Sequence, residues 1–110
     1  MATAEISVLA LGTGTPSTSG YIREIKRVLE AQDRVRFDLH AMGTSLEGST
    51  QDILALVARL HAVPFDLGVE RVYTVLKLDE RRDKAQTLAD KIRSLAETTD
   101  ATPGRPAAAP

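Results

Sequence analysis

The spacing of hydrophobic and polar residues predicts strands and helices in alternation. Residues 4–11 alternate with the period of two that is typical of a strand, and both faces of this strand are mostly apolar. Residues 21–29 place apolar side chains at helical spacing with charged residues between them, which predicts an amphipathic helix. Residues 35–41 alternate between apolar and polar, which indicates a strand with one buried face at the edge of a sheet.

The middle of the chain predicts a short strand followed by a second helix. Residues 44–47 read as the strand, entered through a tight turn. Ser49, with Asp52 three residues later, has the spacing of a helix N-cap. Pro64 lacks a backbone N–H, so we expect it to kink or end this helix before Gly68.

The C-terminal part predicts a last strand, a third helix and a tail. Residues 71–79 alternate as a strand that again carries apolar side chains on both faces. The short third helix is marked by an apolar stripe of Leu88, Ile92 and Leu95. Residues 98–110 are rich in Pro, Ala and Thr without periodicity, so we expect a disordered tail.

This order of elements predicts the fold class. Strand, helix, strand, strand, helix, strand makes two split strand–helix–strand units, which give the ferredoxin-like α+β sandwich, here with an additional C-terminal helix. We expect one domain over residues 1–97, with two helices covering one face of an antiparallel sheet.

The other face of that sheet is predicted to be partly apolar. If Ile6, Val8 and Ala10 pack under the helices, then side chains on the opposite face of the first and last strands point outward: Leu9, Leu11, Tyr73 and Val75. An apolar patch of this kind on a small domain typically marks a protein interface. We therefore expect a homo-oligomer built by sheet-face packing, edge pairing or both.

Composition narrows the classes of function. The formal net charge is -1 and aromatic residues make up only 4%, which argues against a nucleic-acid partner. The chain has no cysteine, which excludes a disulfide scaffold and thiolate metal sites. Neither His40 nor His61 has a second ligand at metal spacing, so no metal site is expected. No apolar run is long enough for a membrane helix and no signal peptide is evident, so we expect a cytoplasmic protein with no membrane partner.

Five fragments, in order, carry a resemblance to a known family. They are AEISV at 4–8, LGTG at 11–14, MGTSLEG at 42–48, GVERV at 68–72 and KLDERRDK at 77–84. With these fragments the chain resembles the small thiamine-binding proteins, single-domain relatives of the YkoF-like thiamine and hydroxymethylpyrimidine binders. The resemblance covers residues 3–96. It implies a ferredoxin-like subunit, a homotetramer made of two dimers, and binding of thiamine or its pyrimidine part without catalysis or cofactor.

A first candidate site lies around the short strand of residues 44–47. An aminopyrimidine needs hydrogen-bond partners and an apolar or aromatic wall, and a thiazolium cation favours a carboxylate. Glu47 is suited to accept from the exocyclic amine, while Thr44 and Ser45 are suited to bond ring nitrogens. The alternative is an ordinary turn with a solvated Glu47. Replacing Glu47 with Gln is expected to weaken thiamine binding if its carboxylate contacts the amine.

Two further polar segments are candidates. Lys77, Asp79 and Arg82 lie at the end of the last strand, where the topology brings Lys77 and Asp79 toward Glu47. The alternative for this charge-dense segment is a solvated surface.

The second segment is the Gly-rich loop of residues 12–19. It carries Thr13, Gly14 and Thr15 ahead of a helix N-terminus, a place where backbone N–H groups favour anions. It matches neither a dinucleotide fingerprint nor a P-loop, and a flexible capped loop is the simpler interpretation.

Three hypotheses of function follow, of which the third is an enzyme that acts on a small phosphorylated metabolite and consumes it over time. The first is a thiamine-binding protein that is not an enzyme, because no catalytic motif is present. The second is a structural or regulatory oligomer that senses a small anion at residues 12–19.

Overall fold

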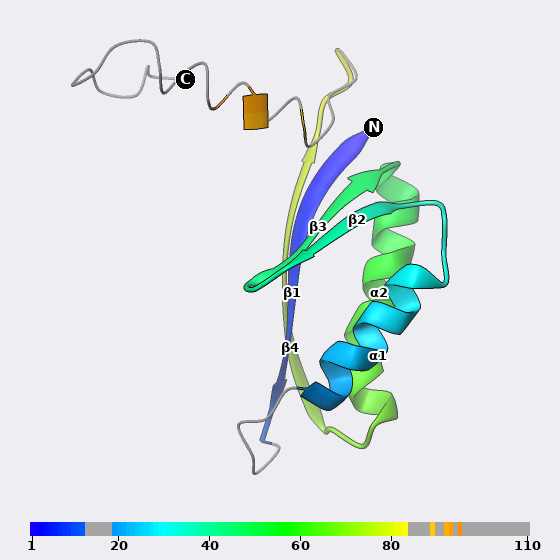
Figure 1. Ribbon diagram of the computed structural model, residues 1–110, viewed down its shortest axis with the longest axis vertical. Coiled ribbons are helices and arrows are strands. Elements are labelled where there is room, and N and C mark those ends of the chain that lie inside the picture. The colour runs from blue at the N-terminus through cyan, green and yellow to red at the C-terminus, as the bar shows by residue number, and fades with distance from the viewer. Residues whose placement is uncertain (13–18, 84–88, 90–91, 94, 96–110) are drawn as a thin grey trace, which may run out of the picture.

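The computed structural model describes residues 1–12, 19–83, 89, 92, 93 and 95. Its strands and helices follow the order βαββαβ: β1 (Ala2–Leu11), α1 (Ser19–Glu30), β2 (Arg36–His40), β3 (Gly43–Gly48), α2 (Thr50–Asp66) and β4 (Arg71–Glu80). The sheet has the order β2-β3-β1-β4, and every neighbouring pair is antiparallel. Both helices lie on one side of it (Figure 1). The predicted ferredoxin-like α+β fold is confirmed, including the edge position of β2.

The core forms where the apolar stripes of the helices meet the even-numbered side chains of β1. Ala2, Ala4 and Ile6 are buried there, and Leu46 of β3 is fully buried beside them. The helices contribute Tyr21, Ile25 and Leu29 from α1, and Ile53, Leu56, Leu60 and Val63 from α2. Burying an aliphatic side chain stabilises the fold by roughly 1.5–3 kcal/mol, so this layer holds both helices on the sheet.

The ends of α2 follow the predicted signals. The Ser49 side chain accepts a hydrogen bond from the Asp52 N–H at 3.1 Å, as an N-cap does. Pro64 lies inside the last turn, and its carbonyl accepts the N–H groups of Leu67 and Val69. Gly68, with φ +92, then reverses the chain. The prediction that this helix ends before Gly68 is confirmed.

The face of the sheet away from the helices is partly apolar, as predicted. Leu9 and Tyr73, which are opposite each other in the β1–β4 register, are 46% and 57% exposed. Val75 is also exposed, at 38%, one row along the same face. We call Leu9, Tyr73 and Val75 the open-face patch. It places a row of large apolar side chains against solvent in the single subunit.

Unequal strand lengths leave part of β1 unpaired on one side. β4 pairs with β1 along its whole length, from Ala2 to Leu11. β3 is shorter and pairs only with residues from Ala2 to Ile6. Among the described residues, no strand pairs with the remaining stretch, residues 7–11, on the β3 side. This free edge positions the site described below.

Some predictions fall outside the described residues. Leu88 of the expected third helix and the expected tail, residues 98–110, are among them. Ile92 and Leu95 are described, are helical and are each 68% exposed. Within the described part of the chain, no helix is long and apolar enough to cross a membrane.

Candidate ligand-binding site

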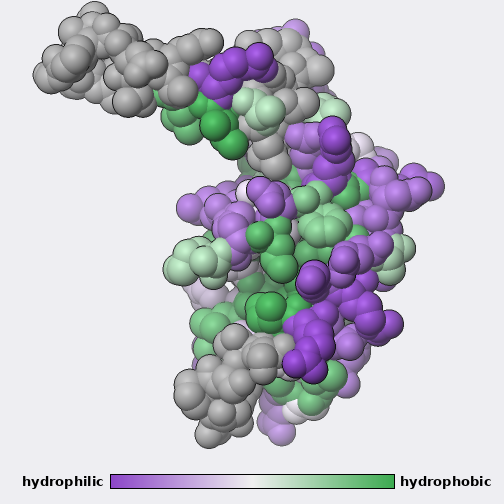
Figure 2. Space-filling model, viewed as in Figure 1, coloured by the Kyte–Doolittle hydropathy of each residue, from purple (hydrophilic) through white to green (hydrophobic). Residues whose placement is uncertain are grey.

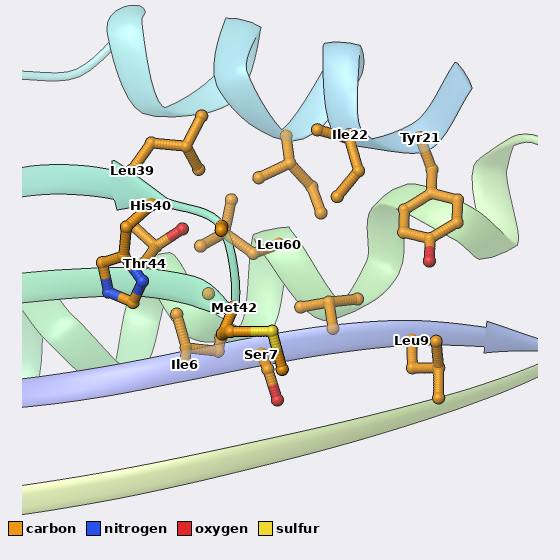
Figure 3. Close-up of a pocket in the computed structure, with 14 residues that line it drawn as sticks. Ile6, Ser7, Leu9, Tyr21, Ile22, Leu39, His40, Met42, Thr44 and Leu60 are labelled. Atoms are coloured by element: carbon orange, nitrogen blue, oxygen red, sulfur yellow. The ribbon is translucent and has the colours of Figure 1, made fainter. Parts of the chain in front are cut away.

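A cavity of about 540 Å³ lies beside the free edge of β1. Its walls come from β1, from α1, from the hairpin that joins β2 to β3, and from Leu60 of α2. Figure 3 shows Tyr21 and Ile22 of α1 pointing toward β1, with Leu39 and Thr44 of the hairpin strands at one end. Hydrophobic side chains also reach the surface in the middle of this view of the molecule (Figure 2). The cavity exists because β3 ends before it covers β1.

The walls of the cavity are mostly apolar. Ile22, Leu39 and Leu60 line it, and no Asp, Glu, Lys or Arg does so among the described residues. The polar residues that line it are few: Ser7, Tyr21, His40 and Thr44. Thr44 is only 4% exposed. This composition is typical of pockets for flat organic ligands, where a few polar groups orient a molecule held by apolar contact.

The hairpin that closes the cavity is held tightly against β1. A Cβ atom added to Gly43 would lie 2.6 Å from the carbonyl oxygen of Ile6, and the φ of Gly43 is +155. Only glycine lets the two backbones approach this closely. The next residue toward the tip, Met42, is 84% exposed and lies near Ser7 at the mouth of the cavity (Figure 3).

A smaller groove of about 280 Å³ lies across the open face of the sheet. The strand register places Ser45, Glu5 and Lys77 in one row, and Glu47, Thr3 and Asp79 in the next. The groove is lined by Thr3, Ala4, Glu5, Ser45, Lys77, Leu78 and Asp79. It is therefore a charged counterpart of the apolar cavity, which lies toward the helix layer.

Polar contacts tie the side chains around this groove together. His40 Nε2 lies 3.2 Å from Ser45 Oγ and 4.0 Å from Glu5 Oε2. Glu47 is only 7% exposed, and its Oε1 lies 3.6 Å from Nη1 of Arg36. A buried carboxylate needs such a charged partner nearby.

The structure divides the residues predicted for a ligand site between two faces. Thr44 lines the cavity, whereas Ser45 points to the open face, because successive strand residues alternate. Ser45, Lys77 and Asp79 come together in the groove, and Glu47 lies in the same row as Asp79. β1 lies between β3 and β4, so Glu47 and Asp79 face each other across Thr3 and do not belong to neighbouring strands.

Arg82 lies apart from both the cavity and the groove. Its side chain is 91% exposed and pairs with Glu80. Thr13, Gly14 and Thr15 of the predicted anion loop lie outside the described residues.

Among the acids of the described residues, Glu80 at the end of β4 is one whose pKa is shifted by its surroundings. The hydroxyl of Thr50 donates a hydrogen bond to it, and Arg82 adds a second bond and a positive charge. These contacts lower the pKa of Glu80, with the Thr50 bond as the largest cause. They join the start of α2 to the end of β4, which is a structural role.

Metal chemistry has no visible basis in this region. In the parts of the chain that the structure describes, no group of three or more His, Asp or Glu side chains is placed to hold a metal ion.

Comparison with known proteins assigns the chain to a family. The family model described as "Thiamine-binding protein" matches residues 4–96. The chain belongs to this family. This family is named for binding, and the YqgV protein of Bacillus subtilis is a relative with 38% identity over 98 residues, 86% of this chain and 94% of YqgV. That relative is named UPF0045 protein YqgV, a name without an activity.

Two solved structures share the family fold. The hypothetical protein MJ1052 of Methanocaldococcus jannaschii superposes with a TM-score of 0.75 at 37% identity, over 87% of this chain and 96% of its own. The domain of unknown function DUF77 from Bacillus cereus gives a TM-score of 0.73 at 27% identity, over 83% of this chain and 86% of its own. Both similarities span most of the two chains compared.

Several residues of the cavity escaped the sequence prediction. Ser7, Val8 and Tyr21 line it, yet each reads in the sequence as an ordinary strand or helix residue. One signal was present: the predicted strand over residues 44–47 is much shorter than the strand over residues 4–11. Such a mismatch leaves a free strand edge, and a free edge under a helix layer leaves room for a cavity.

Proposed function

We propose that this protein binds thiamine, or its hydroxymethylpyrimidine part, in the cavity beside the free edge of β1 and does not convert it chemically. The observation that carries this proposal is the cavity itself, about 540 Å³ with apolar walls and few polar groups. This volume lies within the roughly 300–1,000 Å³ of small-molecule pockets. Membership of a family named for thiamine binding supports the choice of ligand.

The two parts of thiamine suit different parts of the cavity. The flat aminopyrimidine fits between the apolar side chains of Ile22 and Leu39, with the Thr44 hydroxyl as a hydrogen-bond partner. The cavity reaches Ser7, which points to the open face of the sheet. Glu5, two residues before Ser7 on the same face, has a half-exposed carboxylate that would attract the thiazolium cation.

The groove on the open face is the alternative location for the ligand. Ser45, Lys77 and Asp79 would contact a ligand there, and Glu47 lies beside them. We favour the cavity because the groove, at about 280 Å³, is half the size and is lined by charged side chains. Desolvating those charges would offset part of the gain from binding.

We also propose that the subunit assembles into a homotetramer of two dimers in the cytoplasm. The open-face patch supports assembly, because a row of large apolar side chains facing solvent favours burial against a second subunit. Location in the cytoplasm remains a prediction from the sequence.

A matched pair of variants separates the two candidate locations. Thr44 and Thr3 are both strand threonines that are 4% exposed, but Thr44 lines the cavity and Thr3 lines the groove. Replacing threonine by valine removes one hydroxyl and keeps the shape. We expect Thr44→Val to weaken thiamine binding about fivefold to tenfold in calorimetric titration, and Thr3→Val to leave it unchanged.

The other outcomes of this titration also decide between proposals. Weakening by Thr3→Val or Glu47→Gln, with Thr44→Val unchanged, would place the ligand on the open face. A wild-type protein that binds neither thiamine nor hydroxymethylpyrimidine would refute the function. Heat from pyrophosphate alone would favour the anion-sensing oligomer.

A further inference from the structure

The free edge of β1 presents unpaired backbone groups to the cavity. Along a strand, the N–H and C=O groups of one residue point to one side and those of the next residue to the other. The Ile6 carbonyl lies against Gly43 of the hairpin, and the Ala10 N–H points to Tyr21 of α1. The N–H and C=O of Val8, midway between them, therefore face the same side. Val8 lines the cavity.

The positions on either side of Val8 are already occupied. Ile6 is the last β1 residue in register with β3, opposite Thr44. The Ala10 N–H donates a long hydrogen bond, 3.5 Å, to the hydroxyl of Tyr21. A single residue thus has both backbone groups open toward the cavity, with a blocked position on each side.

We infer that the N–H and C=O of Val8 are the groups that select the ligand, by binding a heteroaromatic ring with a hydrogen-bond acceptor next to a donor. This inference rests on the proposed function and states which backbone groups recognise the ring of the ligand. A 4-aminopyrimidine has that edge: a ring nitrogen accepts from the Val8 N–H, and the exocyclic amine donates to the Val8 carbonyl.

The shape of the free edge favours a small ring over a β-strand. A partner strand gains its stability from a ladder of several backbone hydrogen bonds. Among the described residues, the hairpin tip lies against the Ile6 carbonyl and Tyr21 occupies the Ala10 N–H, so Val8 is the residue whose N–H and C=O are both available and a long ladder cannot form. The apolar walls formed by Ile22 and Leu39 suit the faces of a flat ring.

Comparing thiamine with oxythiamine tests this inference. Oxythiamine carries an oxo group in place of the 4-amino group and an N–H in place of the adjacent ring nitrogen, so its donor and acceptor are exchanged. We expect oxythiamine to bind at least about tenfold more weakly in calorimetric titration. Equal affinity would overturn the role of Val8 and leave the proposed function standing. Absence of binding by both compounds would overturn both proposals.

Amide hydrogen exchange at Val8 gives a second readout that needs no variant. We expect the Val8 amide to exchange freely in the protein alone and to become protected with saturating thiamine. The Leu9 amide, which points to β4, is the control and should be protected in both states. Unchanged exchange at Val8 would overturn the inference. Protection of Val8 without ligand that is lost on dilution would also overturn it, because a second copy of the chain would then occupy the edge.

Discussion

Gly43 is the residue on which the shape of the cavity depends most directly. Its backbone passes so close to β1 that a Cβ atom would lie 2.6 Å from the Ile6 carbonyl oxygen. Any side chain here must push the hairpin away from β1 and change the cavity that the two strands share. The backbone conformation of Gly43 therefore helps to set the shape of the candidate site.

Substituting Gly43 should destabilise the protein. We expect Gly43→Ala to lower the free energy of unfolding by about 2 kcal/mol in urea denaturation, because either the hairpin shifts or the backbone is strained. Gly20→Ala is the matched control. Gly20 lies in α1, and among the described residues no atom beyond its chain neighbours and its own helix backbone lies within 4 Å of the added Cβ, so its change should be within about 1 kcal/mol and stabilising. Equal losses in the two variants would contradict the close approach at Gly43.

At the scale of elements, the contact between the start of α2 and the end of β4 is an electrostatic one. Thr50 and Arg82 stabilise the charged form of Glu80, which lowers its pKa. A carboxyl with a lowered folded pKa stabilises the fold above its unfolded pKa. That contribution is lost as the pH falls through the folded pKa.

Removing the Thr50 hydroxyl should reverse the largest single part of the lowering of the Glu80 pKa. We expect Thr50→Val to raise the pKa of Glu80, measured by NMR titration of its side-chain carboxyl. Arg82→Gln should also raise the pKa of Glu80, because it removes a hydrogen bond and a positive charge. A pKa of Glu80 that does not move in Thr50→Val would show that the two side chains are not bonded in solution.

The elements were largely predictable from the sequence because each depends on a local pattern. The alternation in residues 35–41 and the cap at Ser49 both specify structure through neighbours in the chain. The strand and the cap are confirmed, but the buried face expected for β2 is incomplete, because Leu39 is 38% exposed. The cavity was not predictable in the same way. It arises where β3 stops alongside β1, and strand register is set by distant pairings that no local pattern contains.

The candidate site residues also show which features follow from the local sequence and which depend on strand pairing. Thr44 and Ser45 both carry hydroxyl groups suited to a ligand, but their alternation along β3 sends them to opposite faces of the sheet. The type of side chain alone does not predict on which face of the sheet each residue lies. Val8 has no distinctive side chain, and its role depends wholly on where its backbone lies.

At the scale of the whole molecule, the open-face patch predicts self-association. We expect Leu9→Glu to shift the protein from a tetramer toward smaller species in light scattering, because a charge would have to be buried in the interface. Leu54→Glu on α2 is the matched control, since Leu54 is also 46% exposed but lies on the helix layer. An unchanged assembly in Leu9→Glu, or a monomeric wild-type protein, would contradict association through this face.

The central claim is that a thiamine-type ligand lies between α1 and the free edge of β1, and a crystal structure of the thiamine complex tests it most directly. We expect density for the pyrimidine ring against Ile22 and Leu39, with Thr44 within hydrogen-bond distance. Density in the groove near Lys77 and Asp79, or an empty cavity at saturating thiamine, would contradict it.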